Sequence, residues 1–183
     1  ACSTGGPHAL STILTSMPMG FPLPLLVVQH ISEGFIDGFV NWLRGHTLLE
    51  VRLASAGMKL SGGTIYLAPD KRHLEVERIG GDLQIRLTND PPLERFRPSG
   101  TVLFKSLARC CGKNAIGGVL TGMGSDGAVG LQELHEAGGR TFVQDKESAV
   151  IYGMPGAALS KNCVDEVVPL TKISSHLIQL ARR

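Results

Sequence analysis

Residues 114–139, "NAIGGVLTGMGSDGAVGLQELHEAGG", decide the fold class. The run "AIGGVL" (115–120) is short and apolar, which is typical of a buried strand. The segment "TGMGSDG" (121–127) is rich in glycine, so its backbone can turn sharply and approach a ligand closely at a helix N-terminus. The rest of the stretch is predicted to be a helix. Strand, glycine-rich loop and helix in this order form one unit of an α/β fold.

Strands and helices continue to alternate on both sides of this stretch. Further strands are predicted at 24–30, 62–70, 140–145 and 165–170. Helices are predicted at 7–14, 33–46, 97–112, 153–162 and 172–183. We therefore expect an α/β fold, a mostly parallel doubly wound sheet with helices on both faces.

Three local features refine this prediction. Phe35, Phe39 and Leu43 recur at intervals of four and should share one face of their helix, with Gly45 as its expected end. Ser99 is the expected N-cap of the helix that ends near Gly112. Residues 73–88, "HLEVERIGGDLQIRLT", alternate around a Gly-Gly-Asp turn and predict an inserted β-hairpin. The length of 183 residues suits a single domain, 1–183.

Composition excludes several classes of function. Hydrophobic residues make up 43% and charged residues 19%, which is ordinary for a globular domain. A net charge of +2 gives no electrostatic reason to expect nucleic acid or an anionic membrane as partner. No apolar stretch is long enough to span a bilayer. The 4 cysteines lack C-x-x-C spacing, which favours reduced thiols in a cytoplasmic protein.

Three polar residues are predicted at strand-to-helix turns, namely Ser3, His30 and Asp126. Parallel strands bring such turns to one edge of the sheet, and Ser, His and Asp can act as nucleophile, general base and orienting carboxylate. Each also has a structural interpretation, with Ser3 as a turn residue, His30 as a hydrogen-bonded strand end and Asp126 as the N-cap of the next helix. Cys2 is an alternative nucleophile. The chemistry alone leaves an acyl-transfer hydrolase and an anion-binding module equally open.

Several motifs carry a resemblance that covers nearly the whole chain. They are "STGG", "QHISEGF", "YLAPDKRH", "RFRPS", "VLTGMGSDGA" and "YGMP", in this order. In their order and spacing the chain resembles the catalytic domain of chemotaxis protein-glutamate methylesterases (the CheB type). The resemblance implies Ser3 as nucleophile, His30 as base, Asp126 as carboxylate and the Met123 N–H as an oxyanion-hole donor. Thr4 and Arg97 are candidate substrate-rim residues, although Arg97 also suits a structural salt bridge.

The resemblance implies hydrolysis of glutamate γ-methyl esters on bacterial chemoreceptors in the cytoplasm, and many members also deamidate receptor glutamines. It implies no metal and no cofactor. The expected partners are methylated chemoreceptor helices and, in longer family members, a phospho-accepting receiver domain. A catalytically inactive relative that binds an anion or a protein through "TGMGSDG" is the competing interpretation.

The chain departs from the family pattern in three places. Only Ala1 and Cys2 stand where the family has an apolar strand before the Ser. Gly100 and Thr101 follow Ser99 where the family commonly reads "RPSVD", so the Asp is replaced. No receiver domain is present in residues 1–183.

Overall fold

Two groups of parallel strands form the frame of the molecule. The computed structural model describes residues 1–182. In each group every neighbouring pair of strands is parallel. The first group has the order β1 (Leu25–Val27), β3 (Thr64–Leu67), β2 (Glu50–Leu53), and the second the order β6 (Ile116–Val119), β7 (Arg140–Gln144), β8 (Glu166–Val168).

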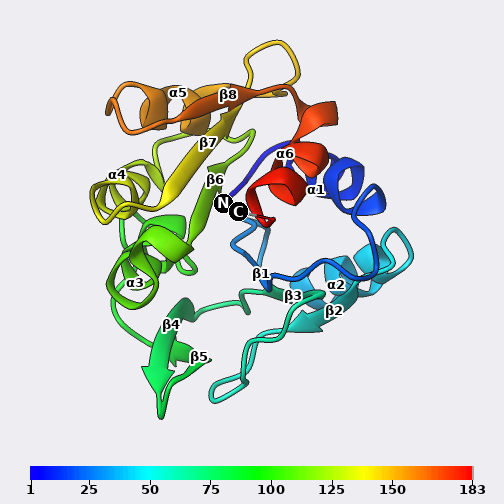
Figure 1. The fold of residues 1–183 in the computed structure, drawn as a ribbon, viewed down its shortest axis with the longest axis vertical. Coiled ribbons are helices and arrows are strands. Elements are labelled where there is room, and N and C mark those ends of the chain that lie inside the picture. Colours follow the sequence, from blue (N-terminus) through cyan, green and yellow to red (C-terminus); the bar gives the residue numbers. More distant parts are fainter. Residues whose placement is uncertain (183) are drawn as a thin grey trace.

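Residues 1–3 join the two groups. Cys2 N donates to Val28 O at 2.9 Å, and Cys2 O accepts from His30 N at 2.9 Å. On the other side Ala1 O accepts from Leu120 N at 2.9 Å, and Ser3 N donates to Thr121 O at 3.0 Å. The N-terminal segment therefore lies between β1 and β6, near the centre of the molecule in Figure 1.

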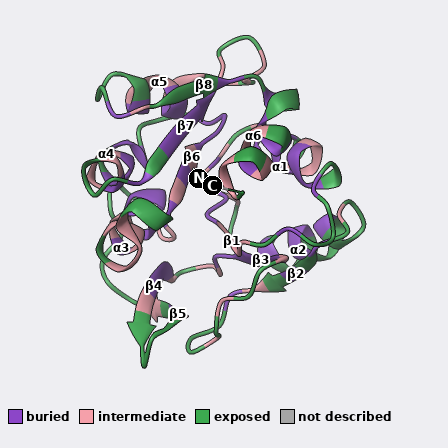
Figure 2. Cartoon of the chain, in the orientation of Figure 1, coloured by how far each residue is buried: buried purple, intermediate pink, exposed green. Residues whose placement is uncertain are grey.

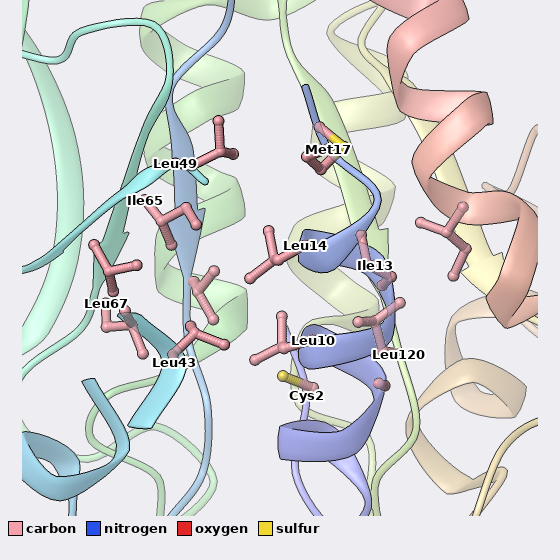
Figure 3. Packing of buried hydrophobic residues seen from close by; sticks show 14 of the residues in the cluster. Cys2, Leu10, Ile13, Leu14, Met17, Leu43, Leu49, Ile65, Leu67 and Leu120 are labelled. Atoms are coloured by element: carbon pink, nitrogen blue, oxygen red, sulfur yellow. The ribbon is translucent and has the colours of Figure 1, made fainter. Parts of the chain in front are cut away.

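Helices cover one face of this sheet. They are α1 (Gly6–Thr15), α2 (Ile36–Arg44) and α6 (Ile173–Leu180), the last following the 3-10 helix η2 (Leu170–Lys172). Leu10, Ile13 and Leu14 of α1 pack toward Leu67 and Leu120 in one apolar cluster, and Figure 3 shows α1 pressing its buried side chains toward the strands. Burial of this apolar surface is the main force that holds the helices on the sheet.

The opposite face is covered by helices over one half and by a hairpin over the other. The elements are α3 (Gly100–Cys110), α4 (Ala128–Glu136), α5 (Gly153–Leu159), the 3-10 helix η1 (Gly112–Asn114) and the antiparallel strands β4 (His73–Ile79) and β5 (Asp82–Thr88). Val119 packs with the helices, whereas Val28 packs with the hairpin. Their chain neighbours Leu120 and Val27 belong to the first face, as the two-residue period of a strand requires. Figure 2 shows buried residues along the strands between these layers.

The predicted fold class is confirmed, because parallel strands lie between helices on both faces with an inserted antiparallel hairpin. The hairpin turns at Gly80 and Gly81, which have φ values of 57° and 93°, a region that glycine enters without strain. None of the helices among residues 1–182 is long and apolar enough to cross a membrane.

Two local features differ from the predicted elements. No strand was predicted at β2, because its side chains are mostly exposed or half-buried and form no continuous apolar run. Phe35 is 64% exposed, because α2 begins one residue later and buries Ile36 together with Phe39 and Leu43.

Candidate active site

Ser3, His30 and Asp126 all lie beyond the carboxyl ends of strands at the middle of the sheet. Ser3 ends the central N-terminal segment, His30 follows β1, and Asp126 lies in the loop after β6. Along the chain, the first strands, β1 and β3, are added on one side of the central N-terminal segment. The later strands, β6, β7 and β8, are added on its other side. Open parallel sheets place binding sites where the strand order reverses in this way.

His30 and Asp126 form a buried pair. His30 Nε2 lies 2.9 Å from Asp126 Oδ2, and the side chains are 9% and 1% exposed. Both ring nitrogens are buried, and neither meets the geometry of a hydrogen bond among the described residues, so Nε2 has only this contact with the carboxylate and Nδ1 has no partner. On one face the imidazole stacks against Phe96, with ring centroids 4.0 Å apart and planes inclined by 4°. One nitrogen is thus held by a carboxylate while the other is left for a ligand or a nucleophile.

The carboxylate of Asp126 also closes the N-terminus of α3. Ser99 Oγ donates to Asp126 Oδ1 at 2.6 Å, Gly100 N to Oδ2 at 2.7 Å, and Thr101 N to Oδ1 at 3.1 Å. The N-cap of α4 is instead Gly127, without a side-chain cap bond, so the alternative interpretation of Asp126 as the cap of the helix after it does not hold. The carboxylate reaches a different helix because its loop folds back toward α3.

Ser99 stands at the N-cap position of α3, as predicted, but its hydroxyl makes no cap bond to the helix and donates to Asp126 instead. Asp126 supplies the acceptors that free helix N–H groups need.

These contacts set the charge of Asp126. Burial alone would raise the pKa of its carboxyl. The contact with His30, together with hydrogen bonds from Ser99 and the backbone N–H groups of Gly100 and Thr101, outweighs burial and holds the pKa well below its usual range. Asp126 is therefore a carboxylate at neutral pH, suited to orient His30 and to stabilise its protonated form.

Thr101, which replaces the Asp of the family pattern, has a defined contact. Its hydroxyl oxygen accepts a hydrogen bond from Gly127 N at 2.8 Å. Because Gly127 directly follows Asp126, this bond fixes the glycine-rich loop against α3. The residue thus supports the loop that carries the carboxylate.

Gln29 clamps the main chains of Ser3 and His30 together. Its buried side-chain amide donates from Nε2 to Ser3 O at 3.0 Å and to His30 O at 2.8 Å. A Cβ built on Gly6 would lie 2.0 Å from Gln29 Oε1, so only glycine leaves room for this amide. The second glycine of "STGG" is therefore required by close packing.

The turn after Ser3 is anchored from the β6 side. Thr121 Oγ1 donates to Thr4 O at 2.9 Å, and Thr121 N donates to Gln144 Oε1 at 2.9 Å. Thr4 itself is exposed beside Ser3. The main chain around Ser3 is thus fixed on both sides.

Met123 lies on the same side of the molecule, in the loop after β6. Its side chain is 67% exposed, and its backbone N–H donates to no group among residues 1–182. The loop is packed tightly against α5, since a Cβ on Gly153 would lie 2.8 Å from Gly122 O. A free N–H on a fixed loop can bind an oxyanion without reorganisation.

Arg97 forms hydrogen bonds to a loop and, within the part of the chain that the structure describes, does not form the salt bridge considered in the sequence analysis. Its Nη1 donates to Asn89 O at 3.0 Å and to Asp90 O at 3.1 Å, and no carboxylate among the described residues pairs with it. It also lines a hollow of about 200 Å³ together with His30 and Phe96. Arg97 therefore lies in the wall of this hollow beside His30, with part of its guanidinium bonded to the two carbonyls.

Cys2 is poorly suited to be a nucleophile. The side chain is 1% exposed, and its thiol donates to Gln29 Oε1 at 3.1 Å. Burial raises the pKa of this thiol to about 11, so almost no thiolate forms at neutral pH.

The sequence did not predict the part that three residues play in the site, namely Gln29, Phe96 and Ser99, the last as a hydrogen-bond donor. Gln29 and Phe96 lie inside the quoted motifs "QHISEGF" and "RFRPS", but their roles depend on contacts between distant segments. Within residues 1–182 no group of three or more His, Cys, Asp or Glu side chains could hold a metal ion.

The chain is similar to known proteins along its whole length. It is 47% identical over 182 residues to "Protein-glutamate methylesterase/protein-glutamine glutaminase 4" of Myxococcus xanthus, covering 100% of this chain and 51% of that protein. A Nitrosospira multiformis protein-glutamate methylesterase/protein-glutamine glutaminase is also 47% identical, over 97% of this chain and 49% of its own length. The chain thus spans about half the length of these curated relatives.

A solved structure supports the same relationship. The crystal structure of the Thermotoga maritima CheB methylesterase catalytic domain superposes with a TM-score of 0.96 at 33% identity, covering 98% of this chain and 95% of that one. Residues 1–177 match the family described as CheB methylesterase. The chain therefore belongs to the CheB methylesterase family.

Proposed function

We propose that residues 1–183 are a single catalytic domain that hydrolyses glutamate γ-methyl esters on chemoreceptors, with Ser3, His30 and Asp126 as its catalytic triad. The observation that carries the proposal is the buried contact of 2.9 Å between His30 Nε2 and Asp126 Oδ2. A carboxylate held charged against an imidazole, beside a serine at a strand end, is the arrangement that activates a hydroxyl nucleophile.

The reaction begins at Ser3. Its Oγ attacks the ester carbonyl carbon while His30 accepts the hydroxyl proton. Because Nε2 faces Asp126, the nitrogen that takes this proton is Nδ1. Asp126 stabilises the imidazolium that results. The ring is thus turned opposite to its orientation in chymotrypsin-like enzymes, where Nδ1 faces the carboxylate.

Met123 N–H donates to the carbonyl oxygen as negative charge develops on it. Loss of one such donor typically lowers kcat by on the order of a hundredfold or more. The imidazolium then gives its proton to the departing methoxy oxygen, and methanol leaves a glutamyl-Ser3 ester. Water, deprotonated by His30, hydrolyses that ester and releases the glutamate carboxylate and free Ser3.

The same steps act on an amide. Attack of Ser3 on a glutamine side chain would release ammonia in place of methanol and leave the same acyl-enzyme. The names of the relatives, which pair methylesterase with glutaminase, support this second substrate. Thr4 and Arg97 would border the bound side chain, Thr4 by its exposed place next to Ser3 and Arg97 by its place in the hollow beside His30.

The proposed setting is the cytoplasm, where the methylated helices of chemoreceptors lie. The relatives are about twice as long as this chain, which supports a receiver domain as a regulatory partner in the longer proteins.

The direct test is methanol release from a methylated receptor fragment by the chain and by Ser3→Ala. We expect release by the unchanged chain and none above background by the variant, with equal melting temperatures. Normal release by Ser3→Ala would remove Ser3 from the mechanism. No release by the unchanged chain, together with phosphate binding at residues 121–127, would instead favour the inactive anion-binding relative.

A further inference from the structure

The ring of Phe96 stacks on the imidazole of His30. The two rings are nearly parallel, at 4° and with centroids 4.0 Å apart. Rings in this arrangement restrict each other to one plane, because rotation of either would force atoms into contact. Nε2 of the same ring lies 2.9 Å from Asp126 Oδ2.

The turn that carries Phe96 is an unusual one. Leu93 and Phe96 exchange two backbone hydrogen bonds, of 3.1 and 2.8 Å, across Glu94 and Arg95. These two residues have φ values of 48° and 76°, in the left-handed region that favours glycine. Non-glycine residues persist there only where the surrounding structure holds them, and such positions cluster at functional sites.

The surroundings do hold this turn, and from two directions. Arg97 ties it back to the carbonyls of Asn89 and Asp90. Ser125 Oγ donates to Glu94 Oε2 at 3.1 Å, which links the turn to the residue next to Asp126. The same glycine-rich loop thus positions both the carboxylate and the turn that bears the stacked ring.

We propose that Phe96 is a positioning residue for the general base. Resting on the function proposed above, the inference is that its ring keeps the His30 imidazole in the orientation that holds Nε2 against Asp126 and leaves Nδ1 free to accept a proton from Ser3. The aromatic face also favours the imidazolium that forms during each turnover. Phe96 does not touch the reacting atoms, so it acts through His30 alone.

Two variants of Phe96 distinguish the effect of the aromatic ring from the effect of side-chain size. Phe96→Leu keeps an apolar side chain of similar length without a ring, and Phe96→Tyr keeps the ring. We expect Phe96→Leu to lower kcat for methanol release by about tenfold or more, the range of a lost ring–cation contact, with KM within about twofold. Phe96→Tyr should stay within about twofold of the unchanged chain.

A second readout does not depend on turnover. Ring current from the stacked Phe96 moves the carbon-bound ring protons of His30 upfield in the proton NMR spectrum, and His30→Ala identifies these signals by their loss. We expect the upfield position to be kept in Phe96→Tyr and lost in Phe96→Leu. A purely structural role for Phe96 would change the melting temperature without this pattern.

Trp42→Leu is the matched control, because Trp42 lies over a different histidine, His46, with centroids 4.1 Å apart and planes inclined by 35°. It should leave kcat and the His30 signals unchanged. Unchanged kcat in Phe96→Leu, an equal loss in Phe96→Leu and Phe96→Tyr, or an unmoved His30 signal would each overturn the inference. Absence of methanol release by the unchanged chain would overturn the proposed function, while the NMR comparison would still show whether Phe96 stacks on His30.

Discussion

The two halves of the site differ in how fully their polar groups are bonded. Asp126 accepts three hydrogen bonds from the start of α3 and contacts His30, so both of its oxygens are occupied. On the other side the Met123 N–H has no acceptor among residues 1–182, and no hydrogen bond there joins Ser3 Oγ to another group. One half is complete before any substrate arrives, and the other presents free groups.

This difference separates two tasks. The Asp126 half holds a charge in place, and a charge buried at 1% exposure needs all its bonds within the protein. In the proposed mechanism the Ser3 half keeps its groups free for the substrate, and its order comes from the main chain, through Gln29 and Thr121. Preorganisation of this kind allows a site to stabilise new charge without moving.

The largest effect is expected from Asp126→Asn, which breaks the complete half. Turnover should fall by about a thousandfold to ten-thousandfold, as in serine proteases that lose the orienting carboxylate. The melting temperature should fall as well, because an amide has one acceptor oxygen for donors that now use two. Kinetics and thermal unfolding of the same preparation measure both.

Ser99→Ala is the control for that variant, since it removes one bond to Asp126 Oδ1 and leaves the His30 contact. It should lower stability by about 1 kcal/mol and turnover by less than about tenfold. Equal losses of turnover in the two variants would mean that Asp126 acts only as a helix cap.

The low pKa of Asp126 adds a pH dependence to the same comparison. The pKa of Asp126 in the folded protein lies below its value of about 4 in the unfolded chain. The stabilisation that the charged carboxylate gives the folded protein is therefore fully present above about pH 4 and is lost as pH falls toward the folded pKa. The stability difference between the unchanged chain and Asp126→Asn should therefore shrink between neutral pH and about pH 3. Urea unfolding at both pH values tests this, and a constant difference would contradict the assignment.

A smaller effect on turnover is expected from Gln29→Met, which removes the hydrogen bonds that join the main chains of Ser3 and His30. It removes the side-chain donor of Ser3 O and of His30 O, which are part-buried, and Ser3 O keeps the bond from Gly6 N. We expect a loss of stability of about 1 kcal/mol for each bond removed. Turnover should fall by about tenfold because the nucleophile and the base lose their shared anchor. Lower stability with unchanged turnover would show that the clamp serves folding alone.

The smallest effect is expected from Cys2→Ser. The thiol is buried and its pKa is raised to about 11, so it takes no part in the chemistry. Turnover should stay within about threefold of that of the unchanged chain. Any loss would come from the placement of a more polar hydroxyl at a position that suits a thiol. Loss of methanol release on alkylation of native Cys2 would restore it as a candidate nucleophile.

Much of this arrangement could be predicted from the sequence. The alternation of apolar runs and helical stretches gave the parallel sheet, and the strand-to-helix turns placed Ser3, His30 and Asp126 at one edge. Side-chain contacts between distant segments could not be predicted. The cap formed by Asp126 joins residues 26 positions apart, and the clamp from Gln29 spans the same separation.

Two local interpretations did not hold, for different physical reasons. Asp126 stands directly before a helix, so local rules assign it to that helix, whereas the fold-back of its loop decides which helix it caps. Phe35 has the right spacing for the buried face of α2, but the helix begins after it.

The central claim is that His30 and Asp126 activate Ser3, and covalent labelling by a fluorophosphonate tests it most directly. The rate of labelling and the labelled peptide should be compared among the unchanged chain, His30→Ala and Asp126→Asn. The account predicts labelling at Ser3 in the unchanged chain and rates lower by at least about a hundredfold in both variants. Labelling at Ser125 or Cys2, or equal rates in all three proteins, would contradict it.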